Sequence, residues 1–124
     1  MTNGDDSEDD MEGLYDCSEI RSKGDFRAFV ECDDETSWFY FCVMKEGQSK
    51  ILRAHHILNG PLDFEQEDIS VRWNNTESHV GFLIRGRLWA VYEAETGVYL
   101  VGRYRAGDNS SIPQAVVESF KPKH

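Results

Sequence analysis

Two apolar runs joined by a polar turn, between Phe26 and Met44, constrain the fold of this chain more than any other stretch. Residues 26–32 read Phe-Arg-Ala-Phe-Val-Glu-Cys, residues 38–44 read Trp-Phe-Tyr-Phe-Cys-Val-Met, and the five residues 33–37 between them are polar. Short runs of aromatic and β-branched residues on either side of such a turn predict a β-hairpin. The second run is apolar at both alternating sets of positions, so it predicts a central strand that is covered on both faces.

Strand patterns continue along the rest of the chain. Residues 50–58 fit either a strand or a helix, and the neighbouring strands favour a strand, while residues 69–73 alternate between apolar and polar side chains. Glycine-containing turns at 85–87 and 95–97 predict two further hairpins, and residues 112–120 predict a short terminal helix. The sequence therefore predicts a mainly β fold with at most one or two short helices. This is an antiparallel meander of six to seven strands, which forms either a bent sheet or a small barrel-like sandwich.

The distribution of charge divides the chain into a tail and one domain. Residues 1–13 contain almost nothing to bury, which predicts an acidic disordered tail in front of a single β-rich domain over 14–124. Residues 14–23 are transitional and also fit a short helix. Six acidic residues and no basic residue fall within 1–12, so removing them from the net charge of −10 leaves the rest of the chain at −4. A domain without a strongly basic surface is not expected to bind nucleic acid phosphates.

The sequence offers no membrane segment. No apolar run approaches the roughly 20 residues that a transmembrane helix needs. The acidic N-terminus is also opposite in character to a secretory signal peptide. We therefore expect a soluble cytoplasmic protein without a membrane partner.

Few residues are arranged for chemistry. Cys17, Cys32 and Cys42 are too scattered for a disulfide framework or a zinc site, and we expect them to be small apolar residues in a reducing compartment. His55 and His56 are adjacent, so on a strand they point to opposite faces and cannot ligate one metal, although one of them would suit a hydrogen-bonded core position. No glycine-flanked serine and no phosphate-binding loop is present. We predict no catalytic residue, no metal site and no cofactor.

Two groups of charged residues are candidate partner contacts. Asp33, Asp34 and Glu35 place three carboxylates at the tip of the first predicted hairpin, where a solvated turn could meet a partner. The dense basic residues lie at hairpin tips and strand ends: Arg85, Arg87, Arg103 and Arg105. In an acidic protein, this basic group suits either an acidic protein surface or the chain's own acidic tail.

Several strand motifs together resemble a known family. They are 33–40 (Asp-Asp-Glu-Thr-Ser-Trp-Phe-Tyr), 51–57 (Ile-Leu-Arg-Ala-His-His-Ile), Trp73, 81–84 (Gly-Phe-Leu-Ile) and 89–92 (Trp-Ala-Val-Tyr). Over about residues 26–104 this pattern resembles a small bacterial domain-of-unknown-function family (number 2251). The resemblance implies a similar fold and a bacterial origin, and it matches His56 to the family's histidine, but it implies no activity. The chain departs from the family by lacking a glycine between Asp34 and Glu35 and by carrying Ser37 in place of a second glycine.

These observations favour a non-enzymatic, protein-binding role. Small size, acidity, a β scaffold and the absence of a catalytic constellation are typical of a binding protein, and a basic partner surface is favoured. The narrower form of this prediction is a bacterial immunity protein that neutralises a toxin. Two alternatives stay open: a small-ligand binder or enzyme with a cleft near His55 or His56, and an acidic nucleic-acid mimic that uses the tail. The sequence does not predict the oligomeric state.

Overall fold

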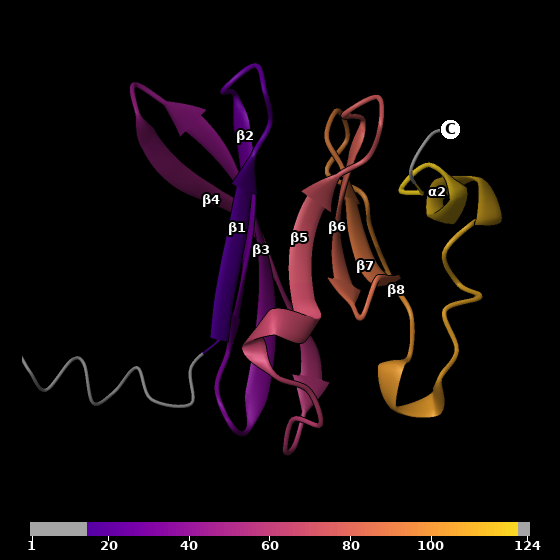
Figure 1. Ribbon diagram of the computed structural model, residues 1–124. Helices are drawn as coiled ribbons and strands as arrows, with labels where there is room; N and C mark the ends of the chain where they lie inside the picture. The colour runs from indigo at the N-terminus through magenta and orange to yellow at the C-terminus, as the bar shows by residue number, and fades with distance from the viewer. Residues whose placement is uncertain (1–14, 122–124) are drawn as a thin grey trace, which may run out of the picture.

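The computed structural model describes residues 15–121, which form two open, four-stranded antiparallel sheets (Figure 1). Sheet A consists of β1 (Tyr15–Ile20), β2 (Phe26–Cys32), β3 (Thr36–Lys45) and β4 (Gln48–Asn59). Sheet B consists of β5 (Ile69–Trp73), β6 (His79–Ile84), β7 (Arg87–Glu93) and β8 (Tyr99–Val101). In both sheets the strands lie side by side in chain order, so the predicted mainly β meander is confirmed. Residues 15–121 form eight strands, where six to seven were predicted. The additional strand is β1, which lies in the transitional segment 14–23 that also fitted a helix. The predicted acidic tail, 1–13, lies outside the described residues.

Local turn chemistry explains the hairpins. Glu46 and Gly47 join β3 to β4 with φ angles of 54° and 79°, and Arg85 and Gly86 join β6 to β7 with 51° and 81°. Two consecutive positive φ angles give the tight turn whose twist matches that of paired strands, and glycine adopts one of them at little cost. The first turn directs residues 50–58 back along β3, so this ambiguous segment is a strand, as predicted.

The two sheets pack face to face and bury one apolar core between them. Val30, Phe39 and Phe41 of sheet A meet Phe82 and Tyr92 of sheet B. The Phe39 and Tyr92 ring centroids are 4.7 Å apart, and the Tyr92 hydroxyl donates a 2.7 Å hydrogen bond to the carbonyl of Phe39. Full burial of each large apolar side chain contributes about 1.5–3 kcal/mol. The inward positions predicted for β5 are confirmed: Ile69 and Val71 are buried, and Trp73 packs against the core.

The C-terminal segment covers the outer face of sheet B. The short helix α2 (Gln114–Glu118) lies on that side of the molecule, and Ile112 and Phe120 on either side of it are buried against sheet B (Figure 1). Gly81 lies beneath Phe120, where a β-carbon would come within 2.3 Å of Leu88 Cδ1. The helix begins later than the predicted residue 112. Ile112 directly precedes Pro113, and helical backbone geometry is unfavourable for a residue that precedes proline, so Ile112 lies outside the helix.

Two short 3₁₀ helices complete the described secondary structure: η1 (Gln66–Asp68) and η2 (Tyr104–Ala106). Among residues 15–121, no helix has the length and apolar character needed to cross a membrane.

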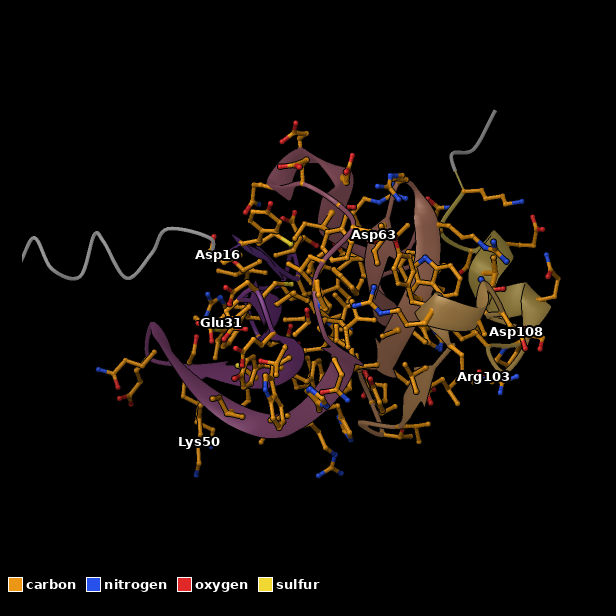
Figure 2. The ribbon with its side chains drawn as sticks, turned by 90° about the horizontal axis from the view of Figure 1, so that it is seen from below. Asp16, Glu31, Lys50, Asp63, Arg103 and Asp108 are labelled. Carbon is orange, nitrogen blue, oxygen red and sulfur yellow. The ribbon has the colours of Figure 1, made fainter. Side chains whose placement is uncertain are left out.

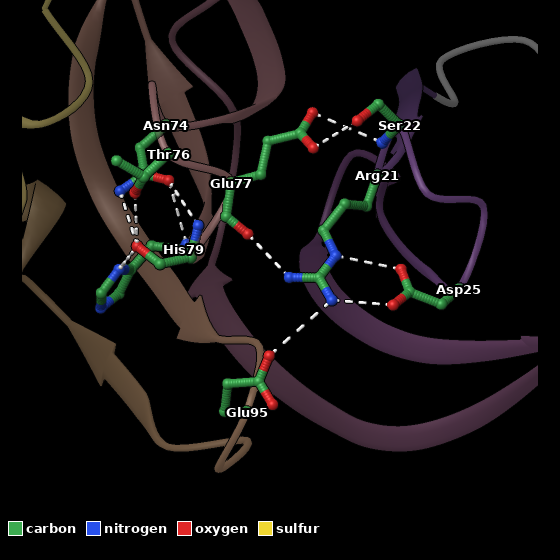
Figure 3. Close-up of polar contacts among 9 residues, drawn as sticks. Arg21, Ser22, Asp25, Asn74, Thr76, Glu77, His79 and Glu95 are labelled. Carbon is green, nitrogen blue, oxygen red and sulfur yellow. Dashed lines mark hydrogen bonds and ion pairs between the residues drawn. The ribbon is translucent and has the colours of Figure 1, made fainter.

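Arg21, in the turn after β1, connects sheet A to two turns of sheet B (Figure 3). Its side chain is buried, and it donates to Asp25 through Nε (3.0 Å) and Nη2 (2.7 Å). Its Nη1 donates to the carbonyl of Glu77 in the turn between β5 and β6 (2.9 Å), and its Nη2 lies 3.8 Å from Glu95. The guanidinium carbon lies 5.1 Å from the ring centroid of Phe26. One cation therefore satisfies acceptors from three separate turns.

We expect Arg21→Met to reduce the free energy of unfolding by about 3 kcal/mol, because it leaves the Asp25 carboxylate and the Glu77 carbonyl without their donor. Urea unfolding at pH 7 measures this loss. The matched control is Arg103→Met, because the ion pair of Arg103 with Asp108 (3.1 Å) is at the surface. The control should lose much less, because an ion pair between exposed side chains contributes little to stability. Equal losses in the two variants would contradict a special role for Arg21.

The ion pair of Arg21 with Asp25 also predicts how the stability of the protein depends on acid pH. The hydrogen bonds from Arg21 hold the pKa of Asp25 below its ordinary value of 3.8. A lowered carboxyl pKa contributes stability that is present above the unfolded pKa and is lost as the pH falls through the folded pKa. The difference in stability between the wild type and Arg21→Met should therefore narrow as the pH falls below about 4.

Candidate functional site

The outer face of sheet A carries aromatic side chains, and no other described segment lies over it (Figure 1). Side chains of a strand alternate between faces, so β3 directs Phe39 into the core and Trp38 and Tyr40 outward. Strands β2 and β4 contribute the outward residues beside them. We call the following six residues the outer aromatic face: Arg27, Phe29, Glu31, Trp38, Tyr40 and His56.

Side chains of the outer aromatic face are held by one another across the strands. Phe29 and Tyr40 are directly opposite in the register and stack with ring centroids 4.5 Å apart and planes at 20°. The Arg27 guanidinium lies over the Phe29 ring at 4.6 Å and donates a 3.1 Å hydrogen bond to the Ser49 hydroxyl. The ring centroids of Trp38 and His56, its partner on β4, are 5.1 Å apart. Such cross-strand contacts fix rotamers before any ligand arrives, which lowers the entropic cost of binding.

This surface corrects one expectation from the sequence. The run 38–44 was predicted to be covered on both faces, and this is wrong for the outer face, where Trp38 is 38% exposed. Strand β3 does lie between β2 and β4 within the sheet, as a central strand should. The apolar pattern was misleading because the C-terminal segment covers sheet B instead of sheet A.

Beside the outer aromatic face is a hollow of about 390 Å³ between β1 and β2. Arg27 lines it together with the carboxylates of Asp16 and Glu31, so both signs of charge border the rings. Cys17 also lines it, and burial raises the pKa of this thiol to about 12. A thiol with this pKa is protonated at neutral pH, so the hollow presents no thiolate nucleophile.

The two edges of sheet A differ. At the β1 edge, the Asp16 N–H donates to Gln66 Oε1 (3.0 Å), and Gln66 Nε2 donates to the Asp16 carbonyl (2.8 Å). One side-chain amide thus satisfies the N–H and the carbonyl of Asp16 as a neighbouring strand would. Strand β4 forms the other edge; its residues 48–54 are exposed, and Ile51 is apolar. An exposed edge of this kind can accept an added strand, so β4 extends the interaction surface.

The three predicted acidic contacts differ from one another. Asp33 Oδ1 accepts hydrogen bonds from the backbone N–H groups of Glu35 and Thr36, both at 2.8 Å, and these bonds hold the pKa of Asp33 below its ordinary value. Asp33 therefore stabilises the turn, whereas Asp34 and Glu35 are exposed side chains at its tip. Replacing the side chains of Asp34 and Glu35 therefore removes no hydrogen bond of this turn, whereas replacing Asp33 does.

The two predicted histidines lie on opposite faces of β4, as the sequence indicated. His55 points inward and stacks on Tyr99, with ring centroids 3.7 Å apart and planes at 8°. Its Nδ1 lies 2.9 Å from the Tyr92 hydroxyl. Since that hydroxyl donates its only proton to Phe39, the network assigns Nδ1 of His55 as the donor. His55 is therefore the hydrogen-bonded core histidine, and His56 belongs to the outer aromatic face.

Residues 15–121 contain no group of three or more His, Cys, Asp or Glu side chains that could hold a metal ion.

Arg85 and Arg87, the predicted basic contacts, lie far from the outer aromatic face. They line a groove on the outer side of sheet B. Figure 2 shows the two sides of the molecule, with Glu31 and Lys50 on the side of sheet A and Arg103 and Asp108 near the C-terminal segment.

Sequence reasoning missed the residues that make up most of the outer aromatic face. Trp38 and Tyr40 were assigned to a strand covered on both faces, and Phe29 was not singled out. The signal that could have found them is in β2, where Arg27 and Glu31 occupy the positions on either side of Phe29 with the same orientation. Two charged residues in alternation with one ring indicate a face that meets water.

We expect the stability of the protein to fall as the pH drops below 6.5, and His55→Phe to weaken this dependence. Burial, with a contribution from Arg53, lowers the pKa of His55 below its ordinary value of 6.5. The folded state then binds fewer protons than the unfolded state between those two pKa values, so stability declines as the pH falls through that window. Thermal unfolding between about pH 8 and pH 5 measures this slope. His56→Phe is the control and should keep the slope, and an unchanged slope in His55→Phe would contradict the assignment.

No protein-family model, no curated protein and no solved structure matches this chain. The resemblance to the domain-of-unknown-function family stays a prediction. The contacts of the outer aromatic face are therefore the basis for a proposal about function.

Proposed function

We propose that this protein is a non-enzymatic protein-binding module that contacts its partner through the outer aromatic face. One asymmetry carries the proposal. The outer face of sheet B is buried by the chain's own Ile112 and Phe120, whereas the outer face of sheet A presents an ordered row of rings to solvent. Apolar rings that no segment within residues 15–121 covers mark a surface for another molecule.

The residue types on this face fit a protein partner. Trp, Tyr and Arg are the residues that most often dominate binding energy at protein interfaces, and Trp38, Tyr40 and Arg27 lie together here. Glu31 and Asp16 supply a polar rim beside the rings. A central group of rings with charged residues at its border is the usual organisation of such interfaces.

The charge of the chain favours a basic partner. A net charge of −10 accelerates encounter with a positively charged protein, and this supports the narrower proposal of an immunity protein that neutralises a bacterial toxin. We place the interaction in the cytoplasm, because the free thiols Cys17, Cys32 and Cys42 suit a reducing compartment. The bacterial origin rests on the family resemblance alone.

Photo-crosslinking tests the site directly. A benzophenone amino acid placed at Trp38 and activated in the cell of origin should give one dominant protein adduct, to be identified by mass spectrometry. The same amino acid at Val101 is the matched control, since Val101 is 37% exposed but belongs to sheet B. Adducts from Val101 and none from Trp38 would contradict the proposed site. A partner that is not a basic toxin would reject the immunity form and keep the binding module.

With the partner identified, we expect Trp38→Ala to weaken its binding about 30-fold, which corresponds to about 2 kcal/mol. Titration calorimetry measures the affinity. The control Val101→Ala should leave affinity within about twofold of the wild type. Urea unfolding of both variants separates loss of binding from loss of folding, because Trp38 lies outside the core.

A further inference from the structure

A groove on the outer side of sheet B gathers positive charge in this acidic protein. It has a volume of about 430 Å³ and lies between the turn that joins β6 to β7 and the C-terminal segment around α2. Four of its lining residues are basic and none is acidic: Arg72, Arg85, Arg87 and Lys121. The groove is on the opposite side of the molecule from the outer aromatic face, so the proposed function does not use it.

Two of these cations are held by neutral groups. Arg87 donates to the side-chain oxygen of Asn109 (3.3 Å) and lies over the Trp89 ring at 4.8 Å. Arg72 donates to the carbonyl of Phe120 (3.4 Å). Within residues 15–121, neither guanidinium forms an ion pair with a carboxylate. The groove thus holds two guanidinium groups that neutral acceptors fix in place and that no carboxylate within residues 15–121 pairs with. A guanidinium group binds a carboxylate through paired N–H donors.

The chain itself carries a ligand of matching chemistry. Residues 5–12 contain six carboxylates, and residues 1–14 contain no basic side chain. The segment is joined to β1, whose Asp16 is held by Gln66 of η1. The backbone carbonyl of Asp68, the last residue of η1, accepts a 2.7 Å hydrogen bond from the backbone N–H of Arg85. The start of β1 and the rim of the groove are therefore connected through one short helix.

Tethering favours this ligand over one from solution. Residues 5–12 precede Tyr15 by three to ten residues, so an extended chain carries their carboxylates at most about 10–36 Å from it. The hydrogen bonds through Gln66 and Asp68 bring the groove rim near this starting point. A short tether gives an effective concentration of about 1 mM or more. An acidic ligand in solution has no such advantage, and the net charge of −10 repels it.

We propose that the groove lined by Arg72 and Arg87 binds the carboxylates of residues 5–12 of the same chain. The acidic segment then acts as a built-in competitor that keeps other polyanions out of the groove. Arg85 and Lys121 contribute long-range attraction, although each also contacts a carboxylate of its own, Asp68 at 3.5 Å and Glu118 at 3.3 Å. Within residues 15–121, Arg72 and Arg87 are therefore the groove cations that no carboxylate pairs with, and they are the ones available to these acids.

Nuclear magnetic resonance of the full chain tests the contact. The comparison variant replaces the six acids by their amides: Asp5→Asn, Asp6→Asn, Glu8→Gln, Asp9→Asn, Asp10→Asn and Glu12→Gln. The Nε–Hε resonances of Arg72 and Arg87 and the amide of Gly86 should differ between the two chains at low salt. Raising the salt to about 0.5 M should remove the difference, because it screens the contact. The Arg53 resonance, outside the groove, is the control and should not differ. Identical Arg72 and Arg87 resonances in both chains would overturn the proposal.

Competition with a hexaglutamate peptide separates this occupant from an acidic partner. We expect the peptide to bind the amide variant at least about 10-fold more tightly than the wild type, because the tethered competitor is gone. Arg87→Gln in the amide variant should abolish this binding, while Arg103→Gln, which changes an exposed cation outside the groove lining, should preserve it. Equal affinity for both chains would assign the groove to a separate acidic ligand and overturn the intramolecular contact. Failure of the peptide to bind either chain would overturn the site itself.

Discussion

The packing of Phe39 and Phe41 against Tyr92 joins the two sheets, and most other features of the molecule depend on it. Because Phe39 and Phe41 point inward, the alternation of β3 sends Trp38 and Tyr40 outward. The Tyr92 hydroxyl bonds the backbone of β3 and meets His55 of β4, so the same residue positions the edge strand. The core contacts therefore decide which side chains are left for recognition.

The two outer surfaces follow from how the chain distributes its remaining apolar residues. Sheet B is followed by a segment with Ile112 and Phe120, and it uses them to cover its own outer face. Sheet A is followed directly by sheet B, which can cover only one of its sides. An aromatic face and a cationic groove thus lie on opposite sides of the molecule, and two ligands could be bound without competing for space.

The fold was predictable to the extent that it depends on neighbours in sequence. The turns at Gly47 and Gly86 and the alternation of Ile69 and Val71 are local signals, and they gave the correct hairpins and inward faces. Which face of β3 is covered depends on Phe82 and Tyr92, more than 40 positions after Phe39, and no pattern within the strand records this. The same holds for the groove, because Arg85 and Arg87 form a visible pair in the sequence but Arg72 and Lys121 join them only after folding. His55 and His56 were separable in advance because adjacent residues of a strand always face opposite ways.

The Gln66 amide at the β1 edge limits how copies of this protein can assemble. A filament built by strand addition needs two open edges on each sheet, one to donate and one to accept. In sheet A, the Gln66 side chain occupies the backbone groups of Asp16 at the β1 edge, and the other edge is β4. Two chains that pair edge to edge through β4 make an isologous contact that closes on itself, so an adhesive β4 edge is compatible with a dimer that does not grow into a fibre through that edge.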